Sequence, residues 1–283
     1  MNRAILALAM KPYSRDTTPA AHERHVANVR AMSDAQRVHA AFEMSMWALA
    51  TSMHATRRVS MSEQEARCKL IERMYRTTIH PDKRTTLKVM HQSFYDAVTR
   101  VVDVLEALDI AYYISGSVAS ITYGMPRTTM DVDIVAEIEL QHIDSLTEQL
   151  SDNYYIQSQD IREAVRFRSS FNIFPNHGPL KIDFFIPDNR PFYRAVFGRV
   201  RYIFLNPDAP RPYALPSAED IILLKLLWYE QGERISVQQW NDILGVIQGQ
   251  FDALDRTYLR HWAAQLAVLP LLVQAFVDAG TDL

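Results

Sequence analysis

The sequence is poor in cysteine and glycine, and it contains no long apolar run. Only 1 of its 283 residues is cysteine and 8 are glycine. The single Cys68 excludes an internal disulfide and a CxxC metal motif, and it favours a reducing cytoplasm. The most apolar late stretch, residues 266–277, is interrupted by Pro270 and Gln274 and is far shorter than the ~20 residues of a membrane-spanning helix. We therefore expect a cytoplasmic protein with no membrane partner.

Zinc chemistry and the common nucleophile motifs also lack a signal. The 9 histidines show no HExxH or similar ligand spacing. There is no G-x-S-x-G elbow and no P-loop lysine motif. With 48% hydrophobic and 22% charged residues, the composition is that of a globular protein rather than of a disordered one.

Charge is distributed unevenly along the chain. Residues 1–90 contain 15 Lys and Arg against 8 Asp and Glu, whereas the remainder contains 15 against 25. A basic segment beside an acidic remainder could attract a polyanion such as RNA. The alternative is that the basic residues solvate helix faces or attract the acidic part of the same chain. Because the charges are dispersed rather than clustered, their pattern favours this second explanation.

Helical patterns dominate both ends of the sequence. Ser33 and Gln36 form a capping-box pattern, and the apolar spacing behind them predicts a helix that ends at Arg57. Further helices are predicted within 62–76 and 87–108. From Ser217 onward the chain is predicted to be helical, with N-caps at Ser217, Ser236 and Asp255.

Short β-branched and aromatic runs occupy the middle of the chain. They predict strands at 111–115, 131–135, 171–174, 180–186 and 200–205, and the third and fourth read as an antiparallel pair. The whole order predicts an α+β fold, a small mixed β-sheet packed by helices, with helical extensions on both sides. We divide the chain into a basic helical extension over 1–85, a core over 86–215 and a helical region over 216–283.

Two carboxylates stand out on the predicted strand at 131–135. Asp131 and Asp133 are two residues apart, so both point to one face while Val132 and Ile134 point to the other. Neighbouring carboxylates repel each other unless a cation lies between them, and hard oxygen ligands suit Mg²⁺. A lone D-x-D pattern is weak by itself, because it also occurs on exposed strand faces.

Gly116 and Ser117 follow a predicted strand and precede a short predicted helix. Glycine lets the backbone approach a phosphate, and the helix start offers N–H groups and a positive dipole end. The alternative is a plain strand–helix turn with Ser117 as the N-cap.

Asp183 lies within an apolar strand, between Ile182 and Phe184. Burial of an unpaired carboxylate is costly, so this residue needs a partner. A metal ion shared with Asp131 and Asp133 would supply one. A salt bridge, for instance to Lys181, is the competing explanation.

The ordered set of Gly116-Ser117, Asp131-x-Asp133 and Asp183 resembles the polymerase-β-type nucleotidyltransferase superfamily over about residues 88–250. Within that superfamily the chain is most similar to the AbiEii-like nucleotidyltransferases, which include toxins of toxin–antitoxin systems. Three further runs carry this similarity: residues 126–129, which include Arg127, residues 217–225 and residues 240–242.

The resemblance implies a role for each matching residue. Asp131 and Asp133 would ligate two Mg²⁺ ions, and Asp183 would ligate the one that activates the acceptor hydroxyl. Nucleotide phosphates would be held by Gly116, Ser117, Arg127 and Lys225, and Asp242 would orient this group or serve as a further ligand. The alternatives are that Lys225 is a snorkelling lysine of an amphipathic helix and that Asp242 pairs with Arg234 or Arg260.

By the same resemblance the protein would transfer a nucleoside monophosphate from an NTP to an acceptor hydroxyl. The acceptor would be RNA, such as a tRNA 3′ end, and the protein a toxin with an antitoxin partner or a phage-defence factor. A small-molecule or protein acceptor is one alternative. A catalytically silent nucleotide-binding module, or a core masked by its own N-terminal helices, is another.

One further segment mixes arginine with aromatic residues. Residues 190–213 contain five Arg among Phe and Tyr. Such a mixture can contact phosphates and stack on bases. The alternative is an ordinary strand edge on which Val200, Tyr202 and Phe204 point inward.

Overall fold

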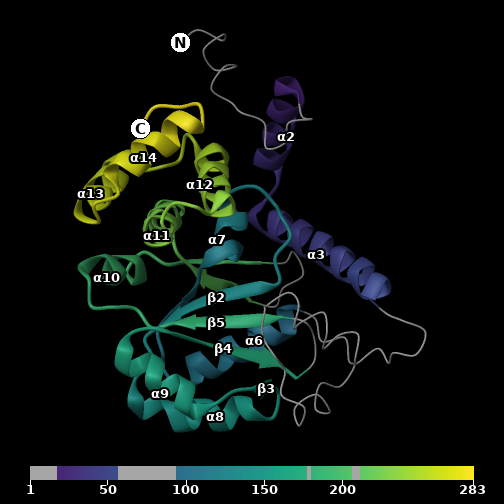
Figure 1. Cartoon of the computed structure of the whole chain (residues 1–283), viewed down its shortest axis with the longest axis vertical. Coiled ribbons are helices and arrows are strands. Elements are labelled where there is room, and N and C mark those ends of the chain that lie inside the picture. Colours follow the sequence, from purple (N-terminus) through teal and green to yellow (C-terminus); the bar gives the residue numbers. More distant parts are fainter. Residues whose placement is uncertain (1–17, 57–93, 177–179, 206–210) are drawn as a thin grey trace. The chain divides into compact units, whose positions relative to one another are not determined.

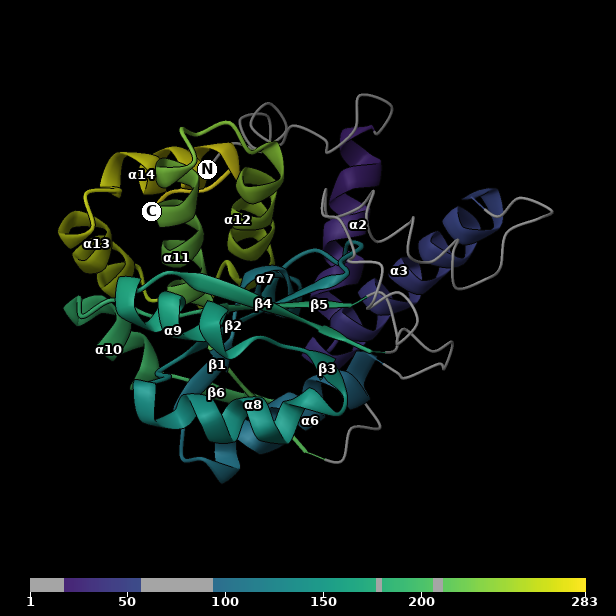
Figure 2. The same ribbon diagram turned by 60° about the horizontal axis from the view of Figure 1, so that its bottom comes forward.

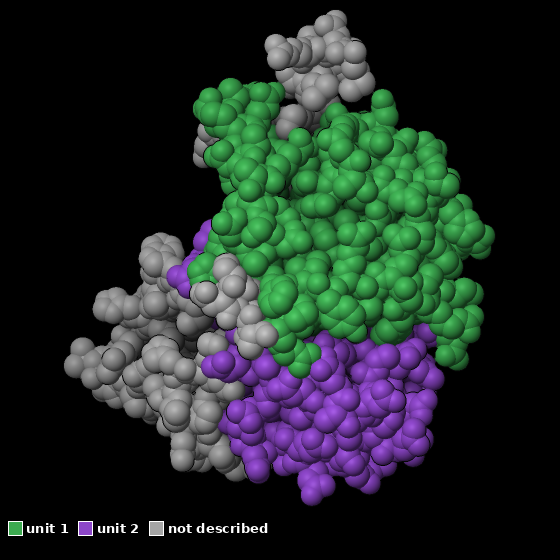
Figure 3. All heavy atoms as spheres, turned by 180° about the vertical axis from the view of Figure 1, so that it is seen from behind, with its two compact units in different colours: residues 1–41, 113–127, 189–283 green, residues 42–112, 128–188 purple. Residues whose placement is uncertain are grey.

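The computed structural model describes residues 18–56, 94–176, 180–205 and 211–283. The chain forms two compact units (Figure 3). Unit 1 contains residues 1–41, 113–127 and 189–283, and unit 2 contains residues 42–112 and 128–188. The predictions for a helix within 62–76 and for Cys68 lie outside the described residues. No helix in the described ranges is long and apolar enough to cross a membrane.

Five strands form a mixed sheet in the order β1-β2-β5-β4-β3 (Figure 1). Strand β5 runs parallel to β2 and antiparallel to β4, and β3 is antiparallel to β4. This confirms the predicted α+β fold and the antiparallel pair, whereas β3 was not predicted. The strands are β1 (Tyr112–Ile114), β2 (Asp131–Ala136), β3 (Tyr154–Tyr155), β4 (Ser170–Pro175) and β5 (Lys181–Phe185).

Helices of unit 2 pack on one another beside this sheet (Figure 2). Helix α6 (Phe94–Ala107) contacts α8 (Ile143–Ser151), which contacts α9 (Ser158–Phe167) and follows the short helix η1 (Leu140–His142). The buried Tyr154 hydroxyl in β3 donates to Ala97 O of α6 at 2.6 Å. A buried hydroxyl needs such a partner, so this bond fixes the edge strand on the helix.

Unit 1 is mainly helical. Its elements are α2 (Pro19–Ala31), the start of α3 (Asp34–Thr56), α7 (Gly116–Tyr123), α10 (Pro191–Phe197), β6 (Arg201–Ile203), β7 (Tyr213–Leu215), α11 (Ala218–Gln231), α12 (Val237–Gln250), α13 (Arg256–Gln265) and α14 (Leu269–Asp278). Strands β6 and β7 pair antiparallel. The predicted N-caps Ser217, Ser236 and Asp255 each accept an N–H in the first turn of the helix that follows, as expected.

Helix α7 and helix α12 approach each other at backbone distance. A Cβ added at Gly249 would lie 2.3 Å from Tyr123 O, so no larger residue fits there without a backbone shift. Gln250 Nε2 donates to the same Tyr123 O at 3.0 Å. Glycine at 249 therefore determines how closely the C-terminal end of α7 packs on α12.

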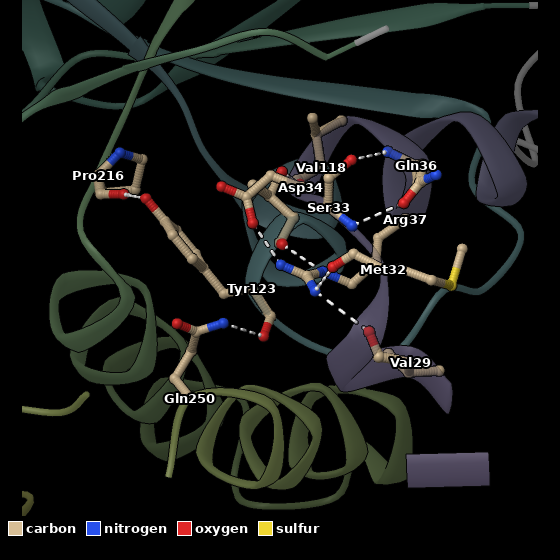
Figure 4. A network of polar contacts seen from close by, with 11 residues as sticks. Val29, Met32, Ser33, Asp34, Gln36, Arg37, Val118, Tyr123, Pro216 and Gln250 are labelled. Atoms are coloured by element: carbon tan, nitrogen blue, oxygen red, sulfur yellow. Dashed lines mark hydrogen bonds and ion pairs between the residues drawn. The ribbon is translucent and has the colours of Figure 1, made fainter. Parts of the chain in front are cut away.

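The predicted capping box starts α3 (Figure 4). Ser33 N donates to Gln36 Oε1 at 2.8 Å, and Gln36 N donates to Ser33 Oγ at 3.2 Å. These two reciprocal bonds satisfy N–H groups that the helix itself leaves without a partner. The helix ends at Thr56, one residue before the predicted end.

Arg37, one turn into α3, joins three chain segments within unit 1 (Figure 4). The residue is 5% exposed. Its Nε donates to Thr122 O of α7 at 2.7 Å, and its Nη1 donates to Met32 O at 2.6 Å and Val29 O at 3.2 Å. Its Nη2 pairs with Asp34. A planar guanidinium thus binds carbonyls at the C-terminal ends of two helices, where the helix dipole favours positive charge.

Substitution of Arg37 tests this connection. We expect Arg37→Met to lower the free energy of unfolding by about 2–3 kcal/mol, because three buried carbonyls lose their charged donor. Urea denaturation followed by circular dichroism measures the change. Arg24→Met, on the exposed face of α2, is the matched control and should leave the midpoint unchanged. Equal midpoints for the two variants would contradict the assigned role.

Candidate functional site

Three aspartates share one face of the β2–β5 pair in unit 2. Asp133 lies directly opposite Asp183 in parallel register, and Asp131 lies opposite Lys181. Adjacent strands are about 4.8 Å apart, and in-register neighbours point to the same face. The alternating residues fill the other face and are fully buried: Val132, Ile134, Ile182 and Phe184. The sequence predicted the alternation in β2, but not its parallel pairing with β5.

Asp183 has a cation beside it already. Lys181 Nζ lies 2.7 Å from Asp183 Oδ2, so the salt bridge considered from the sequence is present. Burial raises the pKa of Asp183, the hydrogen bond and charge of Lys181 oppose this rise, and the negative charge of Asp131 adds to it. The effect of Asp131 on this pKa reports the mutual repulsion of carboxylates on one face.

The ligand types on this face suit a magnesium ion, although the side chains are not yet arranged around one. Three carboxylates offer hard oxygen donors, the ligands that Mg²⁺ prefers. As they stand, no three His, Cys, Asp or Glu side chains in the described ranges converge closely enough to hold a metal. Lys181 binds one oxygen of Asp183 in place of a metal. The chemistry therefore fits, provided that Asp183 exchanges its ammonium partner for the ion.

Gly116 begins helix α7 in unit 1. Its φ of 56° lies in the left-handed region, which glycine adopts without strain. Ser115, and not Ser117, holds the N-cap position, so the alternative that made Ser117 the N-cap is wrong. Ser115 is fully buried, its side chain does not cap α7, and its hydroxyl has no hydrogen-bond partner among the described residues. The sequence analysis missed this serine although it adjoins the Gly-Ser pair.

This helix start differs from others in the same unit. Helices α11, α12 and α13 are each capped by the side chain of the residue at their N-cap. No such bond exists at α7. N–H groups and the positive dipole end at a helix start attract anions, so a phosphate or carboxylate could take the place of the cap at α7.

A buried carboxylate in unit 1 binds two cations. Lys225 Nζ lies 2.8 Å from Asp242 Oδ2 and donates to Gln239 Oε1 at 2.9 Å. Arg127 binds the same carboxylate in a bidentate manner, with Nε 2.7 Å from Oδ1 and Nη2 2.8 Å from Oδ2. Two positive charges against one negative charge leave this cluster with a net charge of about +1, because both side chains stay protonated at neutral pH.

Two alternatives drawn from the sequence are wrong for this cluster. Lys225 is only 2% exposed, so it is not a snorkelling lysine on the surface of its helix. Asp242 pairs with neither Arg234, which binds Glu230, nor Arg260, which donates to the carbonyl of Leu283. Burial by itself raises the pKa of Asp242, but hydrogen bonds and charges from Arg127 and Lys225 outweigh burial and hold the pKa below its usual value.

The run of residues 217–225 also contains a packing network that the sequence did not reveal. Asp220 is fully buried at the start of α11, where Tyr258 OH donates to its Oδ1 at 2.6 Å and Ser217 Oγ to its Oδ2 at 2.8 Å. Glu219 binds Arg199 at 3.2 Å and accepts the N–H of Asp255 at 2.9 Å. These contacts join α11 to α13, so part of the run serves packing.

The arginine and aromatic segment does not point inward as the strand-edge alternative required. Tyr202 in β6 is 67% exposed and Phe204, just beyond it, is 48% exposed. Arg194 of α10 and Arg201 of β6 are also exposed. The strand β6 was predicted correctly, whereas α10 and β7 were not predicted.

Replacement of Asp242 tests the buried cluster. Because the folded pKa of Asp242 is lowered, its stabilisation is present above the unfolded pKa of about 3.9 and is lost as the pH falls through the folded pKa. Asp242→Asn should therefore lower the unfolding free energy by about 3 kcal/mol at pH 7. The gap to the wild type should narrow below about pH 4.

Urea denaturation between pH 3 and pH 7 measures this gap. Glu230→Gln is the control, because it breaks an ion pair of 2.6 Å on the surface, and little change is expected. A gap for Asp242→Asn that stays constant or widens in acid would contradict the assigned charge state.

Comparisons with known proteins give distant likenesses. No family model and no curated protein matches the sequence. An antigenic nucleotidyltransferase-like protein from Paracoccidioides brasiliensis is 20% identical, with 66% of this chain and 93% of that chain covered and a TM-score of 0.39. The antibiotic-resistance factor ANT(2'')-Ia is 12% identical, with 63% and 95% covered and a TM-score of 0.40. A CCA-adding enzyme in complex with ATP is 12% identical, with 63% and 52% covered and a TM-score of 0.27. Such values describe a distant likeness of fold and establish no function for this chain.

Proposed function

We propose that the chain is a Mg²⁺-dependent nucleotidyltransferase that moves a nucleoside monophosphate from an NTP to an acceptor hydroxyl. One observation carries the proposal: Asp133 and Asp183 are direct neighbours on parallel strands, and Asp131 shares their face. Carboxylates crowded in this way favour a divalent cation, and the cation in turn favours a polyphosphate substrate. The order of these residues behind Gly116-Ser117 is the pattern on which the sequence resemblance rests.

The carboxylates would act on the reacting oxygens. When bound, two Mg²⁺ ions stabilise negative charge on the attacking and the leaving oxygen. Asp131 and Asp133 would hold both ions, and Asp183 would hold the one next to the acceptor and accept the proton of the acceptor hydroxyl. The acceptor oxygen then bonds to the α-phosphorus as the bond from that phosphorus to the bridging oxygen breaks and pyrophosphate leaves. Burial, which raises the pKa of Asp183, makes this carboxylate a stronger base than an ordinary aspartate.

Residues of unit 1 would bind the phosphates. The start of α7 at Gly116-Ser117 is not capped by the side chain of its N-cap residue, so it offers an anion site. Lys225 and Arg127 would add positive charge, and Asp242 fixes both side chains in place. Only three residues separate Arg127 from Asp131 in the chain.

The acceptor and the biological role belong to the same proposal. We favour RNA, for instance a tRNA 3′ end, in a cytoplasmic toxin with an antitoxin partner or in phage defence. The basic composition of residues 1–90 and the resemblance to AbiEii-like sequences support this choice.

Loss of the acidic face should abolish transfer. With each of four α-labelled NTPs, Mg²⁺ and total cellular RNA, we expect Asp131→Asn, Asp133→Asn and Asp183→Asn each to reduce transfer on the order of 100-fold or more. Label is followed into RNA, protein and small molecules in parallel, so the acceptor is identified in the same experiment. Asp160→Asn, on an exposed turn of α9, is the control and should stay active. Transfer that persists in the three variants would refute the proposal.

Lys181 should compete with the metal at Asp183. Removal of its ammonium by Lys181→Met leaves the carboxylates on this face without their cation, so Mn²⁺ affinity should rise by about 10-fold, equivalent to one pKa-unit-sized interaction of about 1.4 kcal/mol. Electron paramagnetic resonance of free Mn²⁺ measures binding without nucleotide or turnover. Lys181→Arg keeps the charge and serves as the control. An affinity for Lys181→Met at or below that of the wild type would contradict the competition.

A further inference from the structure

Two aromatic side chains project into solvent from one end of the β6–β7 pair in unit 1. Tyr202 is 67% exposed and Phe204 is 48% exposed. Tyr202 lies opposite Ala214 of β7, a residue too small to cover its ring. Exposure of a large ring to water forgoes roughly 1.5–3 kcal/mol of burial, so a pair of such rings suggests a surface that binds something.

The surrounding charge selects the kind of ligand. Residues 190–213 contain five Arg against one Asp, although the chain beyond residue 90 has an excess of acidic residues. Arg199 binds Glu219 and stacks on Tyr258, so it serves the packing network. Arg194 and Arg201 are exposed. A polyanion therefore fits this surface better than an apolar or basic partner does.

The arrangement suits a flexible strand of bases more than a rigid surface. Residues two apart along an extended strand are separated by about 6.7 Å, so the rings of Tyr202 and Phe204 are spaced to take successive bases. Stacking of bases on aromatic rings is tolerant of sequence, and arginine beside the rings contacts the phosphates. Exposed apolar residues elsewhere in unit 1, Ile235 at 79% and Val237 at 72%, have no aromatic ring to offer.

We propose that β6, Phe204 and α10 form a binding surface for single-stranded nucleic acid. Tyr202 and Phe204 stack on bases, and Arg194 and Arg201 contact phosphates. The role of this surface rests on the proposed function, since the bound strand is then the acceptor. Binding itself needs neither NTP nor Mg²⁺, so it can be measured separately.

The test is the fluorescence anisotropy of a labelled single-stranded 20-nucleotide RNA, with the DNA of the same sequence in a parallel arm. The full chain is used without nucleotide. Tyr202→Leu and Phe204→Leu, which keep an apolar side chain but lose the ring, should each weaken binding by about 10-fold. Tyr202→Phe should bind as the wild type does. Arg201→Gln should reduce the slope of log affinity against log salt by about one.

Ile235→Ala with Val237→Ala is the control, because it removes an equally exposed apolar pair from the same unit and should leave RNA affinity unchanged. The proposal is overturned if the wild type binds neither strand at low salt. It is also overturned if both leucine variants bind as well as the wild type, which would indicate docking of an apolar partner. Equal binding of RNA and DNA supports it and assigns the preference to stacking alone.

The failure of this surface and of the proposed function can be told apart. If RNA binding depends on Tyr202 and Phe204 but no NTP is ever transferred, the surface stands and the transferase proposal falls. If nucleotide transfer to RNA occurs and the leucine variants retain both binding and transfer, the surface falls and the transferase proposal stands.

Discussion

Repulsion among three carboxylates on one face of two neighbouring strands is the constraint on which the chemistry of unit 2 depends. The register places Asp133 beside Asp183, so neither residue can avoid the other by moving along its strand. Lys181, at 2.7 Å from Asp183, relieves part of this repulsion, and the raised pKa of Asp183 shows that burial is not fully balanced. A divalent cation would relieve it further. The same face thus admits two states, one closed by an ammonium and one that holds metal, and the choice between them depends on Lys181.

Unit 1 contains the opposite imbalance. Asp242 is one carboxylate between two cations, and Lys225 is buried so deeply that it requires this partner. Removal of one member of a buried charged group leaves the others uncompensated, so the cluster is held together by mutual need more than by net attraction. Its surplus positive charge is the property that a triphosphate would use. An acidic face and a basic cluster are the two charge types that transfer from a metal-bound nucleotide requires.

Local features were predictable from the sequence, and long-range ones were not. The N-caps at Ser217, Ser236 and Asp255 and the Ser33–Gln36 capping box depend on residues three apart, so the pattern contains the whole interaction. Alternation around Asp131 is equally local. By contrast, Asp133 and Asp183 are brought together by strand pairing across fifty residues, and Arg127 and Asp242 by helix packing across 115. The site residues themselves stay a prediction, and the inward orientation expected for Tyr202 was wrong because an edge strand need not bury either face.

The first helices deserve a different kind of experiment from the one that the sequence suggests. As a basic extension over 1–85 they are a natural target for deletion, particularly if they mask the site. Yet Arg37 binds Thr122 of α7 and Arg30 binds Gln248 of α12, so α2 and the start of α3 belong to the packing of unit 1. Within unit 2, Ser45 of α3 accepts the N–H of Thr129, two residues before Asp131. Deletion removes all of these bonds together, and a loss of activity would then reflect the loss of packing. Single substitutions such as Arg37→Met keep the helices in place and separate their structural role from a masking one.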